Sequence, residues 1–172
     1  MKKNQTMAAA RITSAAVLMA MNIVLCSFGI PVPGGHLYLC DAVIFLAALL
    51  LGPVEAFAVG GIGSFLGDLL FYPLPMFVSL ITHGLQAVAT CLIAHYTFRN
   101  RPKAAAGIGV FVGAVIMVVG YTIGKWFFYS TPEYAIMKLP YEIAQAALGG
   151  VLSLTLYYGF GLQKVYKRIF AA

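Results

Sequence analysis

The sequence predicts an all-α integral membrane protein with six transmembrane helices and both termini in the cytoplasm. The chain has 172 residues, of which 62% are apolar, and its mean hydropathy is +0.92. Only 9% of the residues are charged, whereas soluble domains average about a quarter. A bilayer-spanning helix needs about 20 residues, so six spans leave only short loops. The chain therefore has no room for a domain that hydrolyses ATP.

Proline, glycine and basic residues separate six apolar runs. Pro31 to Gly35 closes the first run, Gly52-Pro53 divides the second from the third, and Pro73 to Pro75 divides the third from the fourth, because proline ends or kinks a helix. The basic segment 99–103 ends the fourth run, and Ser130 to Pro132 ends the fifth. The predicted spans are 8–30, 39–52, 54–72, 76–98, 105–129 and 137–162, in a single domain over 1–172.

The second run is short enough to be half of one bent helix with the third, and the basic residues decide between these readings. Nine of the eleven flank apolar runs, as the positive-inside rule expects, so the net charge of +6 does not indicate nucleic acid. These groups share one side of the membrane only if an even number of spans separates them, which favours six. They are Lys2, Lys3 and Arg11, then Arg99, Arg101 and Lys103, and finally Lys164, Lys167 and Arg168.

The N-terminal run lacks a small-x-small cleavage site, so we interpret it as a retained first helix rather than a signal peptide. Small residues recur within the third and fifth runs, for example Gly109 and Gly113. Such faces let helices approach closely in lipid, where van der Waals packing drives association. We therefore expect the fifth span to pack tightly against a neighbour.

The polar residues within the spans gather at the predicted outer end. Many recur at three- or four-residue spacing, which places them on one face of a helix. Since a charged side chain within a span costs about 2.5–3.5 kcal/mol, charges here are a functional hypothesis. The inner halves carry mainly Arg11, Glu55 and His95, so we expect an outward-facing cavity over an apolar floor rather than a channel. The candidate binding residues are His36, Tyr38, Asp68, His83, Gln86, Tyr121, Lys125, Trp126, Glu142 and Gln145.

Structural alternatives remain open for several of these residues. Glu142 and Lys125 can form an ion pair that only stabilises the fold, and Asp68 can cap or pair locally. The sequence favours Lys138 as a surface anchor. Solvent suffices to explain His36, and an interfacial aromatic belt suffices for Trp126 and Tyr129.

The sequence indicates neither a metal nor a cofactor. Cys26, Cys40 and Cys91 lie in or beside apolar runs without a CxxC motif. His36 with Cys40, and Cys91 with His95, are spaced as metal ligands are, but the two pairs fall on opposite sides of the membrane. We also find no nucleophile motif, so we expect a non-catalytic protein.

The segment from Pro31 to Asp68 carries a family resemblance. Pro31-Val-Pro-Gly-Gly-His36, followed by Leu39-Cys-Asp41 and an apolar stretch to Gly52-Pro53, resembles the substrate-binding S component of an energy-coupling factor (ECF) vitamin transporter. It is most similar to the riboflavin-type group, which includes hydroxymethylpyrimidine and pyridoxine S components. Over the rest of the chain the resemblance is one of architecture.

The resemblance implies partners and a mechanism. An S component captures a vitamin outside the cell membrane, topples in the bilayer and releases it inside, together with a transmembrane T component and two ATPases that alone bind ATP. Family members dock on the T component through an alanine pair on the first helix, and Ala16 and Ala20 match that pair.

Few charges and several aromatic residues favour a small, flat, weakly charged ring as the ligand. Glu142 suits an exocyclic amine or a ring nitrogen, and His83, Gln86 and Gln145 suit a hydroxymethyl or phenolic oxygen. Hydroxymethylpyrimidine or pyridoxine is therefore favoured, with riboflavin as the alternative. A stand-alone proton-coupled carrier that uses the same carboxylates as a relay, and a small membrane enzyme, remain alternatives from other classes.

Overall fold

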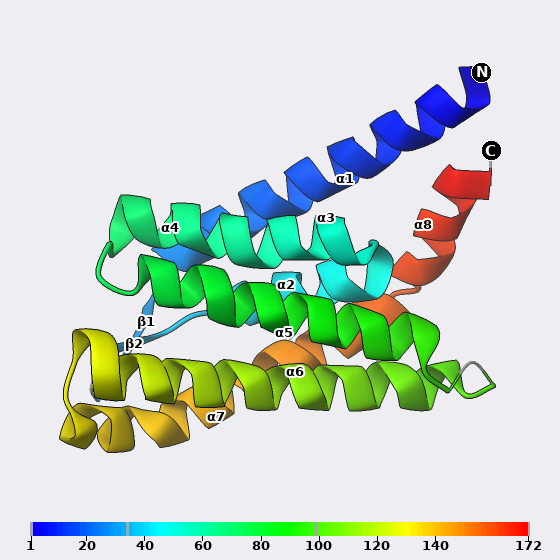
Figure 1. Ribbon diagram of the computed structural model, residues 1–172. Coiled ribbons are helices and arrows are strands. Elements are labelled where there is room, and N and C mark those ends of the chain that lie inside the picture. The colour runs from blue at the N-terminus through cyan, green and yellow to red at the C-terminus, as the bar shows by residue number, and fades with distance from the viewer. Residues whose placement is uncertain (1, 34, 99, 172) are drawn as a thin grey trace.

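The long apolar runs fold into helices that lie side by side in a bundle (Figure 1). This computed structural model describes the backbone of residues 2–33, 35–98 and 100–171, and the side chains of 7–33, 36–98 and 100–169. Gly34 of the proline-glycine motif and Arg99 lie outside the described residues, as do the side chains of Lys2 and Lys3. The elements are α1 (Lys2–Ser27), β1 (Ile30–Val32), β2 (Gly35–Leu37), α2 (Cys40–Leu50), α3 (Pro53–Phe57), η1 (Ala58–Ile62), α4 (Gly63–Phe71), α5 (Met76–Tyr96), α6 (Pro102–Gly124), η2 (Lys125–Tyr129), α7 (Pro132–Leu154), η3 (Thr155–Gly159) and α8 (Leu162–Ala171), where η denotes a π-helical turn.

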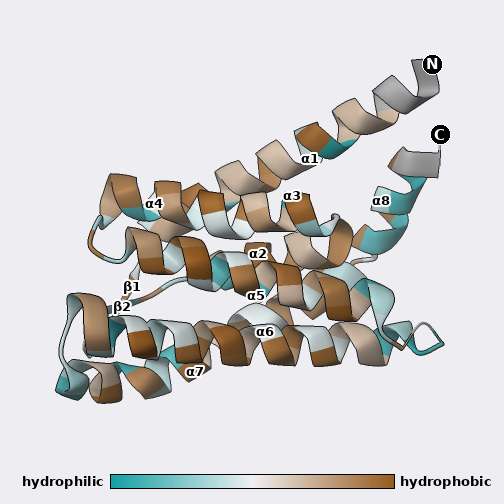
Figure 2. Ribbon diagram, viewed as in Figure 1, coloured by the Kyte–Doolittle hydropathy of each residue, from teal (hydrophilic) through white to brown (hydrophobic). Residues whose placement is uncertain are grey.

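The fold is that of an all-α membrane protein, but six spans are not confirmed. Among the described residues, 4 helices are long and apolar enough to cross a membrane: Met7–Ser27, Pro53–Phe71, Met76–Tyr96 and Pro102–Tyr129. A fifth is added if Pro132–Gly159 and Leu162–Ile169, which are bent by 60°, count as one. Figure 2 shows that apolar residues predominate along these helices, and large apolar side chains such as Val17, Phe77 and Phe111 are exposed, as contact with lipid requires.

The second predicted span is the one that falls short. Helix α2 has 11 residues, about 16 Å at 1.5 Å per residue, against a hydrocarbon core of about 30 Å. Ten of those residues, Cys40 to Leu49, are buried, so α2 is a central core helix. An antiparallel hairpin precedes it, in which Ile30 pairs with Leu37 and Pro31 with His36. The predicted break at Pro31 to Gly35 is therefore correct, although the strands were not expected.

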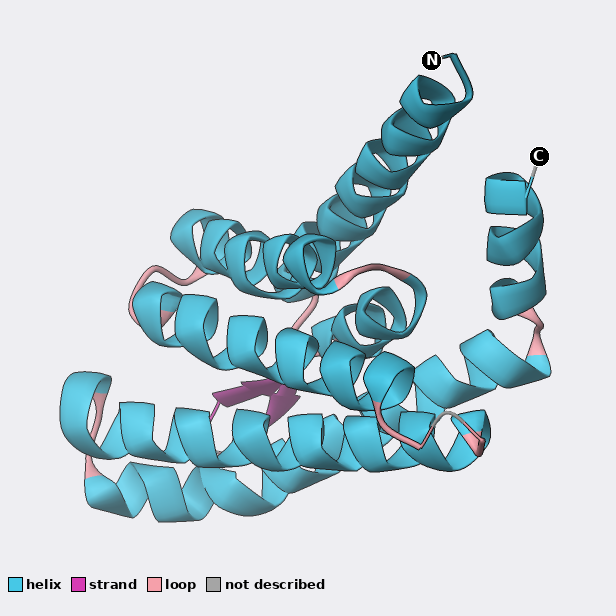
Figure 3. Cartoon of the chain, turned by 45° about the vertical axis from the view of Figure 1, so that its right-hand side comes forward, coloured by secondary structure: helices cyan, strands magenta, loops and turns pink. Residues whose placement is uncertain are grey.

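The C-terminal part differs most from the sequence interpretation. Helix α7 begins five residues before the predicted start at 137, because the Thr131 side chain accepts a hydrogen bond from the Tyr134 amide (3.3 Å) and Pro132 occupies the first turn. Pro140 lies inside the helix without ending it. The helical segment ends at Gly159, three residues before the predicted end of the span at 162, and the chain then turns at Gly161 and continues as a separate helix, α8 (Figure 3).

The chain ends and the α5–α6 connection lie at one end of the bundle, called here the termini end (Figure 1). The hairpin, the α4–α5 connection and the α6–α7 connection lie at the opposite end, the hairpin end. The described basic residues Arg11, Arg101, Lys103, Lys164, Lys167 and Arg168 therefore gather at the termini end. This grouping agrees with the expectation from the sequence that these basic groups share one side of the membrane.

Glycines on α6 let it pack closely on α5, as the sequence predicts. A Cβ added to Gly109 would lie 2.8 Å from the Thr90 carbonyl oxygen. At Gly113 it would collide with Thr90 Oγ1 and lie 2.9 Å from Phe45 Cε1. Gly113 is therefore required for the contact between α5, α6 and the central helix.

Gly113→Leu is expected to destabilise the folded protein, because inserting a large side chain into a closed contact costs typically 1–3 kcal/mol. Gly107→Leu is the matched control on the same helix, since nothing lies within 4 Å of a Cβ there. Thermal unfolding in detergent, followed by circular dichroism, measures both. Equal midpoints for the two variants would contradict the packing role of Gly113.

Candidate functional site

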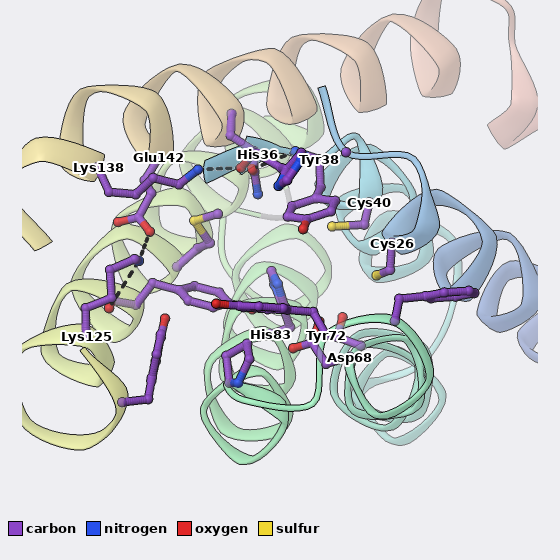
Figure 4. Close-up of a pocket in the computed structure, with 18 of the residues that line it drawn as sticks. Cys26, His36, Tyr38, Cys40, Asp68, Tyr72, His83, Lys125, Lys138 and Glu142 are labelled. Carbon is purple, nitrogen blue, oxygen red and sulfur yellow. Dashed lines mark hydrogen bonds and ion pairs between the residues drawn. The ribbon is translucent and has the colours of Figure 1, made fainter. Parts of the chain in front are cut away.

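A cavity of about 500 Å³ opens at the hairpin end, between the hairpin, α1 and helices α4 to α7 (Figure 4). Its volume lies within the range of about 300–1,000 Å³ found for small-molecule sites. Eight of the ten candidate binding residues line it. They are His36, Tyr38, Asp68, His83, Tyr121, Lys125, Glu142 and Gln145.

Helical spacing explains how these side chains converge. Tyr121, Lys125 and Tyr129 all line the cavity, and the π-helical turn η2 begins at Lys125. Such turns occur frequently at functional sites. Trp126, which follows Lys125 in the sequence, does not line the cavity and is 41% exposed. Gln86 also lies outside the lining, fully buried behind His83.

Lys125 and Glu142 form a buried ion pair between η2 and α7. The Lys125 ammonium donates to Glu142 Oε1, and both side chains are at most 5% exposed. The same ammonium lies 5.0 Å from the centre of the Tyr121 ring. Glu142 Oε2 is buried and makes no hydrogen bond with any described residue. A ligand donor at that oxygen would satisfy an otherwise costly buried acceptor.

The expectation that Lys138 is a surface anchor is wrong. Lys138 is 8% exposed, lines the cavity and donates to the backbone carbonyl of His36. Because its ammonium finds an acceptor in the hairpin, the side chain turns inward from α7. This contact ties the hairpin to the wall of the cavity.

Asp41, which sequence reasoning did not include in the site, organises the residues behind it. The Tyr38 amide donates to Gln145 Oε1 (2.9 Å), which directs Gln145 Nε2 to Asp41 Oδ2 (2.7 Å). Gln86 Nε2 donates to Asp41 Oδ1 (2.7 Å). One fully buried carboxylate thus joins α2, α5 and α7. Its position at the start of an otherwise apolar run was the available signal.

This network also orients His83. Because Gln86 Nε2 donates to Asp41, the remaining Gln86 oxygen accepts from His83 Nδ1 (2.6 Å). A neutral imidazole that donates at Nδ1 has an acceptor at Nε2. His83 therefore offers the cavity a hydrogen-bond acceptor, as long as the ring is neutral.

Asp68 lies across the cavity from the Lys125–Glu142 pair (Figure 4) and accepts a hydrogen bond from Ser79 Oγ. Ser79 has one hydroxyl proton, so the Tyr121 hydroxyl donates in turn to Ser79 Oγ (2.5 Å). Asp68 on α4 thus bonds to the neighbouring helix α5 rather than capping its own helix, and its side chain also lines the cavity. The Tyr121 hydroxyl oxygen keeps its capacity to accept a hydrogen bond, and Tyr121 also lines the cavity.

Aromatic side chains complete the walls, and several were not among the candidates. Burial, with a smaller contribution from the Asp68 charge, raises the pKa of Tyr38 to about 12, so its hydroxyl stays protonated at neutral pH. Tyr134 was missed although it precedes Lys138 by four residues on the same helix face. The added lining aromatics are Phe71, Tyr72, Tyr129 and Tyr134.

The cavity combines aromatic walls with a few convergent polar groups, the usual composition of a small-molecule site. The lining residues Glu142 and His83 carry acceptors for which the described residues supply no donor, Glu142 Oε2 and His83 Nε2. Within the described part of the chain, no three His, Cys, Asp or Glu side chains are grouped as metal ligands. The arrangement is suited to holding a polar ring between aromatic side chains.

Comparisons with known proteins place this chain in a family. The sequence model of the ECF-type riboflavin transporter S component family matches residues 6–164. The chain is 33% identical over 151 residues to the thiamine precursor transporter HmpT of Lactococcus lactis subsp. cremoris (strain MG1363), covering 85% of this chain and 84% of that protein. It is 28% identical over 141 residues to an uncharacterized protein in a gap 3' region of Pyrococcus woesei, covering 81% of this chain and 88% of that protein. The family match extends over nearly the whole chain, which therefore belongs to the ECF-type riboflavin transporter S component family.

Proposed function

We propose that this chain captures hydroxymethylpyrimidine or a closely similar vitamin ring such as pyridoxine in the cavity at the hairpin end. Uptake then depends on a T component and two ATPases of the ECF type, the partners that membership of an S component family implies. The proposed location is the cell membrane, with the hairpin end outside.

The observation that carries the proposal is Glu142 Oε2, a buried oxygen that accepts no hydrogen bond from any described residue. Glu142 Oε2 is buried beside the cavity while Oε1 is already paired with Lys125. An exocyclic amine on an aminopyrimidine supplies a donor for that oxygen, and a hydroxymethyl group supplies one for His83 Nε2. The relationship to a thiamine precursor transporter supports the same choice.

The walls support a flat ring of low charge. Tyrosines and Phe71 offer faces for stacking, while the Lys125 and Glu142 charges compensate each other. A strongly charged ligand would have to break this ion pair or remain without an opposite charge. Riboflavin, the alternative, has a larger ring system and a ribityl chain that the two acceptors do not specifically explain.

Calorimetric titration of the purified, folded protein with hydroxymethylpyrimidine, pyridoxine and riboflavin tests the proposal. We expect the first or second compound to bind at least tenfold more tightly than riboflavin, a difference of about 1.4 kcal/mol. Tighter binding of riboflavin would overturn the substrate assignment but not the family. Mass spectrometry of co-purified small molecules provides an independent identification.

The two other classes are separated by assays of the protein alone. A proton-coupled carrier would accumulate substrate in liposomes under a pH gradient, whereas an S component would not transport without its partners. A membrane enzyme would convert the bound compound, and chromatography of the recovered ligand would reveal the product.

Both chain termini and residues 99–103 are expected to face the cytoplasm, because the basic residues gather at that end. On a background in which Cys26, Cys40 and Cys91 are alanine, Arg101→Cys should resist an impermeant thiol reagent added to intact cells. Ser130→Cys, at an exposed position of the hairpin end, should react. Labelling at 101 but not at 130 would show that the termini end faces outward, the opposite of the predicted orientation.

A further inference from the structure

The C-terminal helix α8 is a strongly amphipathic element that the cavity does not use. Leu162, Val165, Tyr166 and Ile169 follow one another at spacings of three, one and three residues and share one face. The basic residues Lys164, Lys167 and Arg168 lie on the other side, and the described part of the helix has no acidic residue. Such a basic amphipathic helix is typical of a membrane–water interface.

The geometry turns α8 away from the bundle axis. Gly161 adopts a φ of +70°, a left-handed conformation that favours glycine, and the chain then bends by 60° between α7 and α8 (Figure 3). If α7 runs across the membrane, α8 runs closer to the membrane plane than to its normal. With 10 residues, α8 extends about 15 Å along that surface.

The apolar face of α8 is only partly covered by protein. Tyr166 packs against the core cluster formed by Ala15, Val43, Ala47, Leu51 and Val59. Val165 and Ile169 remain 50% and 56% exposed, and Phe160, just before the helix, is 75% exposed. In contact with lipid acyl chains these side chains would be buried, while the basic face would lie at the level of the headgroups.

A hollow of about 590 Å³ lies beside the helix at the termini end. Arg11, Tyr96, Tyr166 and Lys167 line it, so two cationic side chains face one concave surface. Glu55 is its acidic member, but the Glu55 carboxylate folds back toward Gly52 at the N-terminus of α3, where the helix dipole is positive. The two cations are therefore in excess over the acid. Basic pockets between membrane helices are suited to anionic lipid headgroups.

We propose that α8 lies in the headgroup layer at the termini end and, with Arg11, binds the phosphate of an anionic phospholipid in this hollow. A phospholipid accounts for all three features, because its acyl chains can contact the apolar face of α8 and its negative phosphate can bind the basic side chains in the hollow. Nothing in this proposal depends on which vitamin the cavity binds.

The experiment compares lipid retention by two charge-matched variants. Full-length protein is reconstituted in nanodiscs of phosphatidylcholine and phosphatidylglycerol in a two-to-one ratio, then released into detergent for native mass spectrometry. A basic residue at an anionic surface contributes about 1 kcal/mol, or about fivefold. Lys167→Gln with Arg168→Gln should therefore lower the preference for phosphatidylglycerol at least about tenfold. Arg101→Gln with Lys103→Gln removes the same charge from the same end, but neither residue lines the hollow, so it should lower the preference by less than about threefold.

Retention of phosphatidylglycerol by the wild type in the presence of glycerol 3-phosphate or inorganic phosphate supports a lipid site, whereas displacement by either would identify a soluble phosphate site and overturn the proposal. Equal lipid preference in wild type and both variants would also overturn it.

A second measurement does not depend on charge removal. A polarity-sensitive fluorophore is attached to Ile169→Cys on the background without Cys26, Cys40 and Cys91. Apolar emission in mixed nanodiscs supports the proposal. Water-like emission that becomes apolar only when partner subunits are added would overturn it in favour of a protein contact.

Discussion

Replacing Glu142 with glutamine is expected to weaken binding of hydroxymethylpyrimidine by about 10- to 150-fold. Glu142 Oε2 is the buried acceptor without a partner among the described residues. Glutamine keeps the side-chain volume and an oxygen for Lys125, but it places a donor where an amine-bearing ligand also donates. Loss of a charge-assisted hydrogen bond costs about 1.5–3 kcal/mol, and each 1.4 kcal/mol is tenfold in affinity. Calorimetric titration of folded protein measures the change.

Glu133→Gln is the matched control, since Glu133 is an exposed glutamate near the start of the same helix. It should leave the affinity unchanged. If Glu142 and Lys125 form only a structural pair, Glu142→Gln should lower the unfolding temperature because it leaves a buried ammonium with a weaker partner. In that case the affinity of the folded variant for hydroxymethylpyrimidine would fall by less than about threefold. This result would rule out Glu142 as the ligand anchor.

Introducing tryptophan at both Ala16 and Ala20 is expected to abolish vitamin uptake and leave vitamin binding intact. Both alanines lie on the exposed side of α1, beside the exposed Val17 and Met21, and neither lines the cavity. Small residues permit close approach of helices in lipid, and a bulky ring at either position prevents it. Uptake in cells and calorimetric binding to the purified variant separate the two functions.

Val115→Trp serves as the control for this pair, because Val115 is 45% exposed on α6, which lies across α5 from α1 (Figure 1). It should transport normally. Co-purification of the double variant with the T component and ATPases in normal amounts, together with normal uptake, would remove Ala16 and Ala20 from the partner interface.

Local sequence patterns predicted the convergence of side chains within single helices. Tyr121, Lys125 and Tyr129 recur every four residues and all reach the cavity. Those patterns did not reveal the acceptor of each donor. Lys138 was interpreted as a surface residue because its partner, the His36 carbonyl, lies 102 positions away in the sequence.

The membrane character of this protein, its all-α class, its S component family and the helix faces that carry its polar residues could all be predicted from the sequence. These properties follow from composition, from residue spacing and from a motif that is contiguous in the chain. Only the tertiary structure decided that α2 is a short buried core helix, that α8 bends away from α7, and that Asp41 joins three helices behind the cavity. The physical reason is that burial and hydrogen-bond partners depend on which distant segments pack together, whereas hydropathy and helical period are properties of neighbouring residues.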